Sequence, residues 1–194
     1  AGMDCAAGTE GKKEKSTAAR VSEEGLPPPE VREETVYARF RALGIPWKTH
    51  IHAPVFTVEE AAALYAGQPG GHTKNLFLKD RKGGLWLVVA RDDLTIDLNR
   101  LARQLGCQRF SFGAPELLLA HLGIAPGSVT PFALINDEAG TVRLVLDDGL
   151  LGFELLNFHP LRNDRTTAVT PGDLMRFVQA TGHEPLITAL PTRG

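Results

Sequence analysis

The sequence is poor in the features that mark secreted, membrane and disulfide-bonded proteins. Its two cysteines, Cys5 and Cys107, form neither a disulfide framework nor a metal-ligand spacing, which is typical of a reducing compartment. No run approaches the roughly 20 apolar residues of a membrane span, and the N-terminal region lacks the apolar stretch of a secretory signal. We therefore expect a soluble, cytoplasmic protein that does not contact membranes.

Common catalytic and nucleotide-binding motifs are absent as well. His50 and His52 fall on one face of an expected strand, but no third ligand, HExxH or paired CxxC accompanies them, so we expect no metal. The only serines after residue 30, Ser111 and Ser128, stand in no GxSxG elbow. Neither GxGxxG nor a phosphate-binding GK[ST] loop occurs. A catalytic thiol at Cys107 lacks a histidine-rich surrounding motif.

The charge distribution argues against a nonspecific nucleic-acid coat. Residues 1–30 hold four Lys/Arg and six Asp/Glu, so of the 21 basic and 23 acidic residues the rest of the chain keeps 17 of each. Nonspecific binding needs excess positive charge to displace counterions. A local basic patch remains compatible with this balance.

Composition and periodicity predict one domain after an N-terminal tail. Residues 1–29 are rich in small and charged residues and end in three prolines, so we expect disorder or a start that is foreign to the native chain. Residues 30–194 are enough for one substantial core. We expect helices at 30–43, 57–67, 97–105, 114–122 and from 170, and strands at 47–52, 72–79, 85–90, 132–136, 142–146 and from 153. Interleaved strands and helices with one clear hairpin predict an α/β fold with a mixed central sheet covered by helices.

Helix boundaries rest on local signals. The expected N-caps are Thr57, Asp97 and Thr170, and the expected terminating glycines are Gly44, Gly67 and Gly123.

The most informative segment is 151–169, LGFELLNFHPLRNDRTTAV. Side chains alternate along a strand, so Asn157 and His159 share a face with the apolar residues before them, and the turn that follows brings back Thr166 and Thr167. A buried polar pair requires hydrogen-bond partners. The segment is either the floor of a pocket or a satisfied corner of the core.

Two further features carry possible chemistry. Lys74 enters a strand directly after a glycine turn, in GGHTKNLFLKD, although a solvated lysine at a sheet edge is the simpler interpretation. Residues 127–131 form a GxxxP loop that could present backbone N–H groups to a ligand, although an ordinary turn explains the same pattern.

Taken together, HAPVFTVEEAAA, GGHTKNLFLKD, LGIAPGSVTP and ELLNFHPLRNDRTTAV resemble the YbaK and prolyl-tRNA synthetase editing-domain superfamily. The resemblance spans about residues 31–187 and is strongest to the free-standing alanyl-tRNA(Pro) deacylase branch (ProXp-ala or PrdX). It implies a mixed α/β domain without a cofactor that hydrolyses mischarged alanyl-tRNA(Pro) in trans. The implied partner is aminoacyl-tRNA, with prolyl-tRNA synthetase or an elongation factor as transient partners.

The resemblance also implies a site. Lys74 matches the lysine near the tRNA terminus, the loop of Gly127, Ser128, Val129, Thr130 and Pro131 matches the loop that holds the aminoacyl end, and His159 matches the pocket histidine. Asn157, Thr166 and Thr167 are adjacent pocket candidates. Lys79, Arg81 and Lys82 form a small basic cluster that could contact the tRNA backbone or be a charged hairpin turn.

Other functions remain open. A different editing specificity, such as cysteinyl-tRNA(Pro), is the nearest alternative. A non-catalytic module that binds tRNA or a synthetase is an alternative of another class. An unrelated small-molecule hydrolase is disfavoured because triad and metal motifs are missing.

Overall fold

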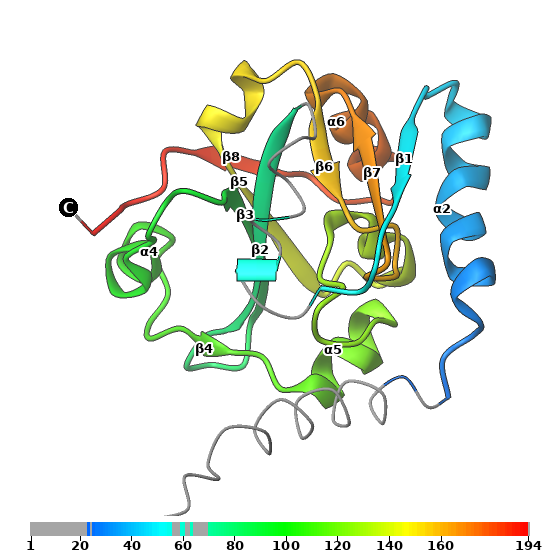
Figure 1. Cartoon of the computed structure of the whole chain (residues 1–194). Coiled ribbons are helices and arrows are strands. Elements are labelled where there is room, and N and C mark those ends of the chain that lie inside the picture. Colours follow the sequence, from blue (N-terminus) through cyan, green and yellow to red (C-terminus); the bar gives the residue numbers. More distant parts are fainter. Residues whose placement is uncertain (1–22, 24, 56–58, 61–62, 64–69, 194) are drawn as a thin grey trace, which may run out of the picture.

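The computed structural model describes residue 23 and residues 25–55, 59–60, 63 and 70–193 (Figure 1). Most of the expected tail 1–29 therefore lies outside the described residues. Of the expected helix 57–67, including its cap Thr57 and its terminator Gly67, only Glu59, Glu60 and Ala63 are described, and these three are helical.

The described strands form one mixed sheet in the order β1-β7-β6-β2-β3-β5-β8, with β4 paired to β2. The predicted hairpin is antiparallel β2–β3, whereas the pairs β2–β6, β3–β5 and β5–β8 are parallel. The prediction of a mixed central sheet in an α/β fold is confirmed. The strands are β1 (Lys48–Ile51), β2 (Gly71–Lys79), β3 (Leu85–Arg91), β4 (Ser111–Phe112), β5 (Val142–Asp147), β6 (Leu156–Phe158), β7 (Arg165–Val169) and β8 (Leu186–Thr188).

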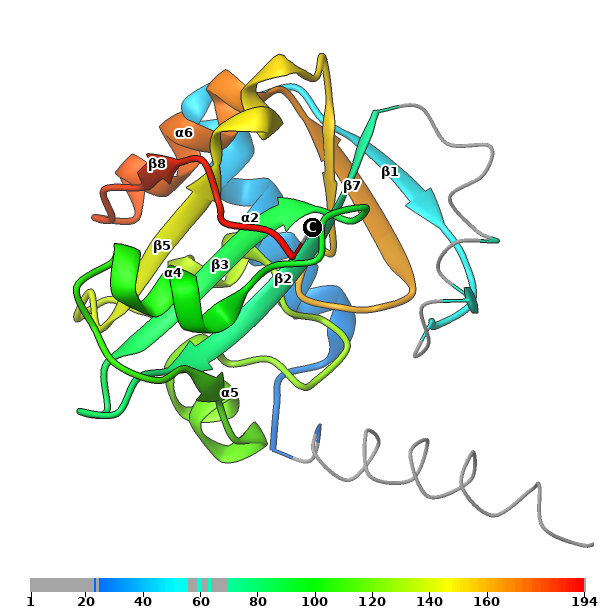
Figure 2. The ribbon, with the colours of Figure 1, turned by 90° about the vertical axis from the view of Figure 1, so that its left-hand side faces the viewer.

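Helices cover both faces of this sheet. The face that we call the α2 face packs against α2 (Pro29–Leu43), α5 (Pro115–Leu122) and α6 (Pro171–Ala180). The face that we call the α4 face packs against α4 (Leu98–Gln104), and Figure 2 shows α4 and α2 on opposite sides of the strands. No helix in the described part of the chain is long and apolar enough to cross a membrane.

Most predicted helix boundaries hold because their signals are local. Asp97 accepts the N–H of Arg100 and Thr170 accepts that of Asp173, which satisfies a free donor in each first turn. Gly44 and Gly123 end α2 and α5 in the left-handed conformation that glycine adopts without strain.

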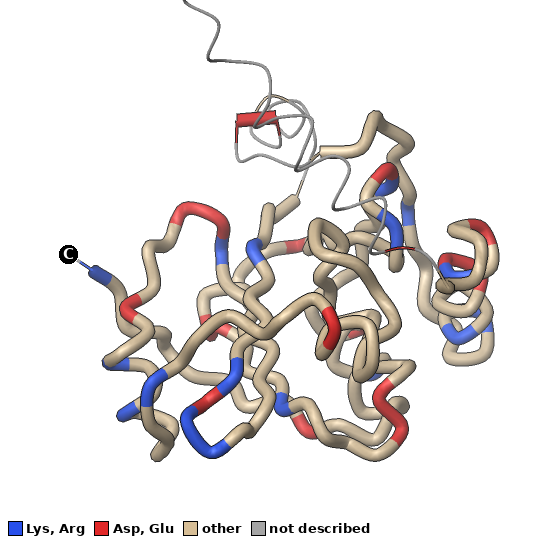
Figure 3. Tube along the Cα trace, turned by 90° about the horizontal axis from the view of Figure 1, so that it is seen from below, with Lys and Arg blue, Asp and Glu red and all other residues tan. Residues whose placement is uncertain are grey.

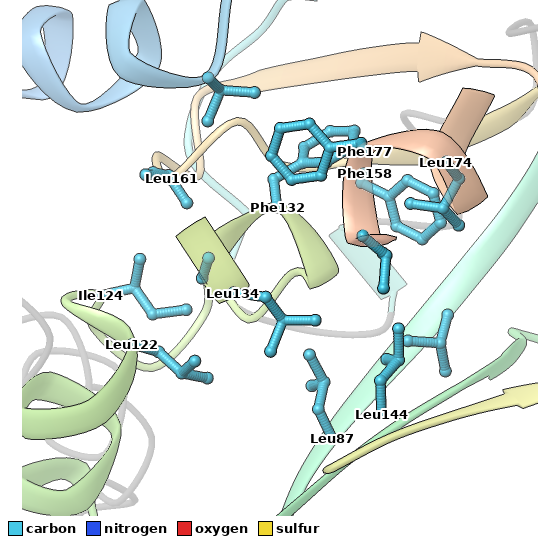
Figure 4. Close-up of a cluster of buried hydrophobic side chains, with 14 of the residues drawn as sticks. Leu87, Leu122, Ile124, Phe132, Leu134, Leu144, Phe158, Leu161, Leu174 and Phe177 are labelled. Atoms are coloured by element: carbon cyan, nitrogen blue, oxygen red, sulfur yellow. The ribbon is translucent and has the colours of Figure 1, made fainter. Parts of the chain in front are cut away.

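The core on the α2 face contains a cluster of aromatic rings (Figure 4). Phe132 is fully buried, and its ring packs edge-to-face against Phe40 of α2, Phe158 of β6 and Phe177 of α6, with centroids 5.3–5.4 Å apart. This one side chain therefore joins β6 to two helices.

The predicted strand at 132–136 is wrong. The segment is instead a 3-10 helix, η1 (Pro131–Asn136), in which Thr130 accepts the N–H of Phe132 as a cap and Pro131 occupies the first turn. Successive side chains from Pro131 to Leu134 are all buried, so the apolar run fits a short buried helix. A second 3-10 helix, η2 (Asp148–Gly152), precedes β6, and the short strands β4 and β8 were not predicted.

Candidate functional site

The sheet register brings predicted site residues into one row. His72 of β2 pairs in parallel with Asn157 of β6, and Lys74 and His159 each follow two residues further along their segments, on the same face as this pair. The antiparallel β6–β7 register, continued by one residue, brings His159 level with Thr166. Paired residues in neighbouring strands point to the same side of a sheet. Lys74, His159 and Thr166 therefore share the α4 face.

The row continues into β1, at the edge of the sheet. Thr166 of β7 pairs with His50, and two residues further on the side chain of His52 reaches back to Thr166, with Nε2 2.7 Å from the hydroxyl. The rings of His52 and His159 have their centroids 6.2 Å apart. At about 4.8 Å between strands, the row from β2 to β1 spans about 14 Å.

Lys74 carries the positive charge of this row. It is half-buried, stands opposite Ala90 of β3 and forms no ion pair with another described residue. An ammonium group without a carboxylate partner can bind an anion such as a phosphate.

His159 is held by the main chain. Its Nδ1 lies 2.8 Å from the carbonyl oxygen of Arg165, and a carbonyl only accepts, so Nδ1 carries the proton and Nε2 of the neutral ring has the lone pair. Burial lowers the pKa of His159, and the nearby His52 lowers it further. The ring is therefore neutral at pH 7 and offers an acceptor.

Asn157 is buried in the middle of β6, two residues before His159, and pairs with His72 of β2 and Ala168 of β7. Its side-chain Nδ2 donates to the main-chain carbonyl of Gly71 at 3.3 Å, while its main-chain carbonyl accepts from the Thr73 hydroxyl at 2.9 Å. Gly70 has a φ of 97°, and a Cβ there would lie 2.9 Å from Asn157 Nδ2. The glycine turn thus lets β2 approach this amide closely.

The turn between β6 and β7 is fixed by an ion-pair cluster. Arg162 is buried and donates Nε and Nη2 to the two carboxylate oxygens of Asp164. These hydrogen bonds lower the pKa of Asp164. The carbonyl of Asp164 accepts the N–H of His52 at 3.0 Å, so the turn supports both His52 and His159.

Thr167 lies on the opposite side from Thr166, because neighbouring strand residues alternate. It is fully buried on the α2 face, where its hydroxyl is 3.0 Å from the Tyr37 hydroxyl and 2.9 Å from the Thr49 hydroxyl. The hydroxyl oxygens of Tyr37 and Thr49 are 2.6 Å apart. The structure thus separates the two predicted threonines and places Thr167 in a buried hydroxyl cluster.

The loop of residues 127–131 leads directly into η1. Gly127 is exposed with a φ of 93°, whereas Ser128 and Thr130 are buried. The Ser128 N–H donates to Ala125, and Thr130 caps η1. Pro131, the first residue of η1, is buried next to Phe132, and Val129 packs against the core. Among described residues, no hydrogen bond joins this loop to Lys74 or His159.

The basic cluster lies at the far end of β2. Lys79 is five residues from Lys74, which is about 17 Å along a strand. Arg81 and Lys82 follow in the turn, where the Asp80 carboxylate accepts the N–H groups of Lys82 and Gly84. In Figure 3 basic and acidic positions are interspersed along the chain. Lys74 and this cluster are therefore well separated along β2.

Sequence reasoning missed His52 as a site residue and considered it only as a metal ligand. The available signal was its spacing of two from His50, which put both on one face. In the described part of the chain no three His, Cys, Asp or Glu side chains are placed to hold a metal. Burial raises the pKa of Cys107, which makes it a poor nucleophile.

Comparison with known proteins identifies relatives over most of the chain. The aminoacyl-tRNA editing domain family matches residues 52–177. A Bos taurus protein named prolyl-tRNA synthetase associated domain-containing protein 1 is 42% identical over 154 residues, which cover 77% of this chain and 90% of that protein. The prolyl-tRNA editing protein ProX of Acetoanaerobium sticklandii is 35% identical over 152 residues, which cover 78% of this chain and 93% of its own.

The fold also has a counterpart among solved structures. A crystal structure described provisionally as a trans-editing enzyme for prolyl-tRNA synthetase superimposes with a TM-score of 0.65 at 22% identity, over 88% of this chain and 100% of its own. This likeness shows a shared fold. Together, the comparisons confirm the resemblance that the motifs indicated.

Proposed function

Since this chain belongs to the aminoacyl-tRNA editing domain family, we propose that it is a trans-editing hydrolase that converts alanyl-tRNA(Pro) and water to alanine and free tRNA(Pro). The observation that most supports a site for this reaction is the row of Lys74, His159 and Thr166 across adjacent strands. The proposal is supported by the names of two relatives, which refer to association with prolyl-tRNA synthetase and to prolyl-tRNA editing. Aminoacyl-tRNA is the proposed partner, and prolyl-tRNA synthetase a transient one.

Lys74 would bind the 3′ end of the tRNA. Its ammonium group can contact a terminal phosphate or the ester oxygen, since no described carboxylate is paired with it. Lys74 and His159 follow the paired residues His72 and Asn157 on the same face of the sheet, so the ester would lie between the cation and the imidazole.

His159 would position the aminoacyl group or the attacking water. The neutral ring has a fixed tautomer with an acceptor at Nε2, and the buried Asn157 supports the strand that carries it. An activated ester with a neighbouring ribose hydroxyl needs orientation and oxyanion stabilisation more than a strong enzyme nucleophile.

Backbone N–H groups of the 127–131 loop would stabilise the oxyanion. The Ser128 N–H is bonded to the carbonyl of Ala125, whereas the N–H groups of Gly127, Val129 and Thr130 donate no hydrogen bond to another described residue. We therefore assign the donor role to Gly127, Val129 and Thr130. The side chains of Ser128, Thr130 and Pro131 are buried and would fix the shape of the loop. The main chain of these three residues would contact the substrate.

The experiment follows amino-acid release from alanyl-, cysteinyl- and prolyl-tRNA(Pro). We expect alanine to be lost and proline to be retained. His159→Ala should slow alanine release at least about tenfold, since a hydrogen bond to a charged or reacting group contributes about 1.5–3 kcal/mol. Lys74→Ala should mainly raise KM. Matched controls are His121→Ala on α5 and Arg103→Ala on α4, which lie outside the row.

Several outcomes would overturn the proposal. Faster release of cysteine than of alanine would assign a different editing specificity. Binding of tRNA without turnover of any ester would indicate a non-catalytic module. Full activity of both His159→Ala and Gly127→Val, each verified as folded by circular dichroism, would contradict the site.

A further inference from the structure

The turn that follows His159 contains a strained residue. Residues 160–164 connect β6 to β7, and the hydrogen bond from His159 Nδ1 to the carbonyl oxygen of Arg165 closes this turn. Inside the turn Leu161 has a φ of 62°, in the left-handed region that favours glycine, and its side chain is buried in the core on the α2 face (Figure 4). A residue other than glycine keeps such a backbone only where its surroundings hold it there.

Arg32, in the first turn of α2, holds the carbonyl group of Leu161. Its Nη1 donates to this carbonyl oxygen at 2.8 Å. The side chain of Arg32 is buried, its Nε donates to the carbonyl oxygen of Pro27 at 3.0 Å, and its Nη2 lies 3.6 Å from the Glu23 carboxylate. A guanidinium group stays charged and its donors lie in one rigid plane. Arg32 therefore fixes the orientation of the peptide group that follows Leu161.

A second arginine attaches the same turn to α2 more loosely. Arg162 binds Asp164 within the turn, and its Nη1 lies 3.7 Å from the carboxylate of Glu33 and 3.9 Å from that of Glu30. Both distances exceed that of a hydrogen bond, and Glu30 is exposed, so solvent weakens this attachment. The hydrogen bond from Arg32 is thus the shorter of these polar links between α2 and the turn.

We propose that Arg32 is a positioning residue for His159. By holding Leu161 in the left-handed conformation, it keeps the carbonyl of Arg165 where it accepts the proton of His159 Nδ1. Arg32 and Leu161 lie on the α2 face whereas His159 faces the α4 side, so Arg32 acts through the main chain of the turn and does not touch the substrate. This inference rests on the proposed function and deepens it, because it gives α2 a role in the site.

The first test is a double-mutant cycle between Arg32 and His159 on alanyl-tRNA(Pro). Arg32→Met removes the donors and keeps an unbranched apolar side chain. Because a misplacement of about 1 Å can cost about a hundredfold in rate, kcat should fall about five- to hundredfold while KM changes less than about twofold. In the His159→Ala background the same substitution should change kcat less than about twofold, since Arg32 acts through the imidazole. An equal fall in both backgrounds would indicate a general loss of packing and overturn the proposal.

Arg39→Met is the matched control. Arg39 lies on the same helix, and its Nη1 also donates to a distant main-chain carbonyl, that of Ala180 at 3.1 Å. This carbonyl belongs to the end of α6, so kcat should not change. All variants are assayed at a temperature at which circular dichroism shows them folded. If Arg32→Met does not fold, Arg32→Lys, which keeps the charge without the planar group, takes its place in the cycle.

The second test follows the tautomer of His159 without turnover. In nitrogen NMR spectra protonated and unprotonated imidazole nitrogens resonate far apart, and the His159 signals are assigned by their absence in His159→Ala. At neutral pH the proton should be on Nδ1 in the wild-type and Arg39→Met proteins, and shared between the two nitrogens in the Arg32 variant. An unchanged tautomer in the folded Arg32 variant would overturn the positioning role. If the wild-type protein hydrolysed no ester, the proposed function would fail, and the NMR spectra would still decide whether Arg32 positions His159.

Discussion

Replacing Phe132 by leucine tests whether the aromatic cluster joins the 127–131 loop to the sheet. Phe132 is fully buried and makes three edge-to-face contacts, with Phe40, Phe158 and Phe177. At about 0.5–1.5 kcal/mol for each aromatic pair beyond area burial, Phe132→Leu should lower the free energy of unfolding by about 1.5–4.5 kcal/mol. Urea denaturation with an unchanged m-value measures this loss.

Phe177→Leu is the comparison. Phe177 is equally buried and contacts two of the same rings, Phe40 and Phe132, so the same reasoning gives a loss of about 1–3 kcal/mol. Only Phe132 directly follows the loop, so only Phe132→Leu should also slow alanine release under conditions where both proteins are folded. An equal or larger destabilisation by Phe177→Leu would refute the reasoning.

Three further predictions concern pH, the hydroxyl cluster and the basic cluster. Burial lowers the pKa of His159, so the unfolded chain binds this proton more readily than the folded one. The free energy of unfolding should therefore fall between about pH 7 and pH 5, and it should fall less steeply in His159→Gln. Equal dependence of the free energy of unfolding on pH in the two proteins would contradict this. Tyr37→Phe removes two hydroxyl contacts and should destabilise by about 1–2 kcal/mol in thermal unfolding, whereas a loss below about 0.3 kcal/mol would argue against the cluster. Alanine at Lys79, Arg81 and Lys82 together should weaken tRNA binding and reduce the salt slope by about 2–3, and an unchanged slope would remove the cluster from the interface.

Features encoded by neighbouring residues could be predicted from the sequence. Asp97 and Thr170 cap helices by accepting the N–H of the residue three positions on, and Gly44 and Gly123 end helices through their own backbone conformation. The motif resemblance identified the family because several segments occur in order. Phe132–Asn136 was misassigned because an apolar run without a clear period fits a strand and a short buried helix alike.

The site itself depends on contacts between distant residues. Lys74 and His159 come onto neighbouring segments of one face only through the parallel β2–β6 pairing, and Thr166 and Thr167 point to opposite faces only once β7 has a fixed register. His52 finds its partner 114 residues away in Thr166. Such registers follow from the packing of the whole sheet. Local sequence patterns could therefore predict which residues are candidates for the site, but not how these residues are arranged in space.

The anchors of the two imidazoles have a consequence for how this protein can evolve. His159 and His52 are oriented by the carbonyls of Arg165 and Ala53, and every amino acid, proline included, carries that atom. In many enzymes a carboxylate side chain has this task, and one mutation removes it. Here substitutions at positions 53 and 165 change the side chain but keep the main-chain carbonyl that sets each ring tautomer. These two positions should therefore tolerate substitution better than their closeness to the histidines suggests.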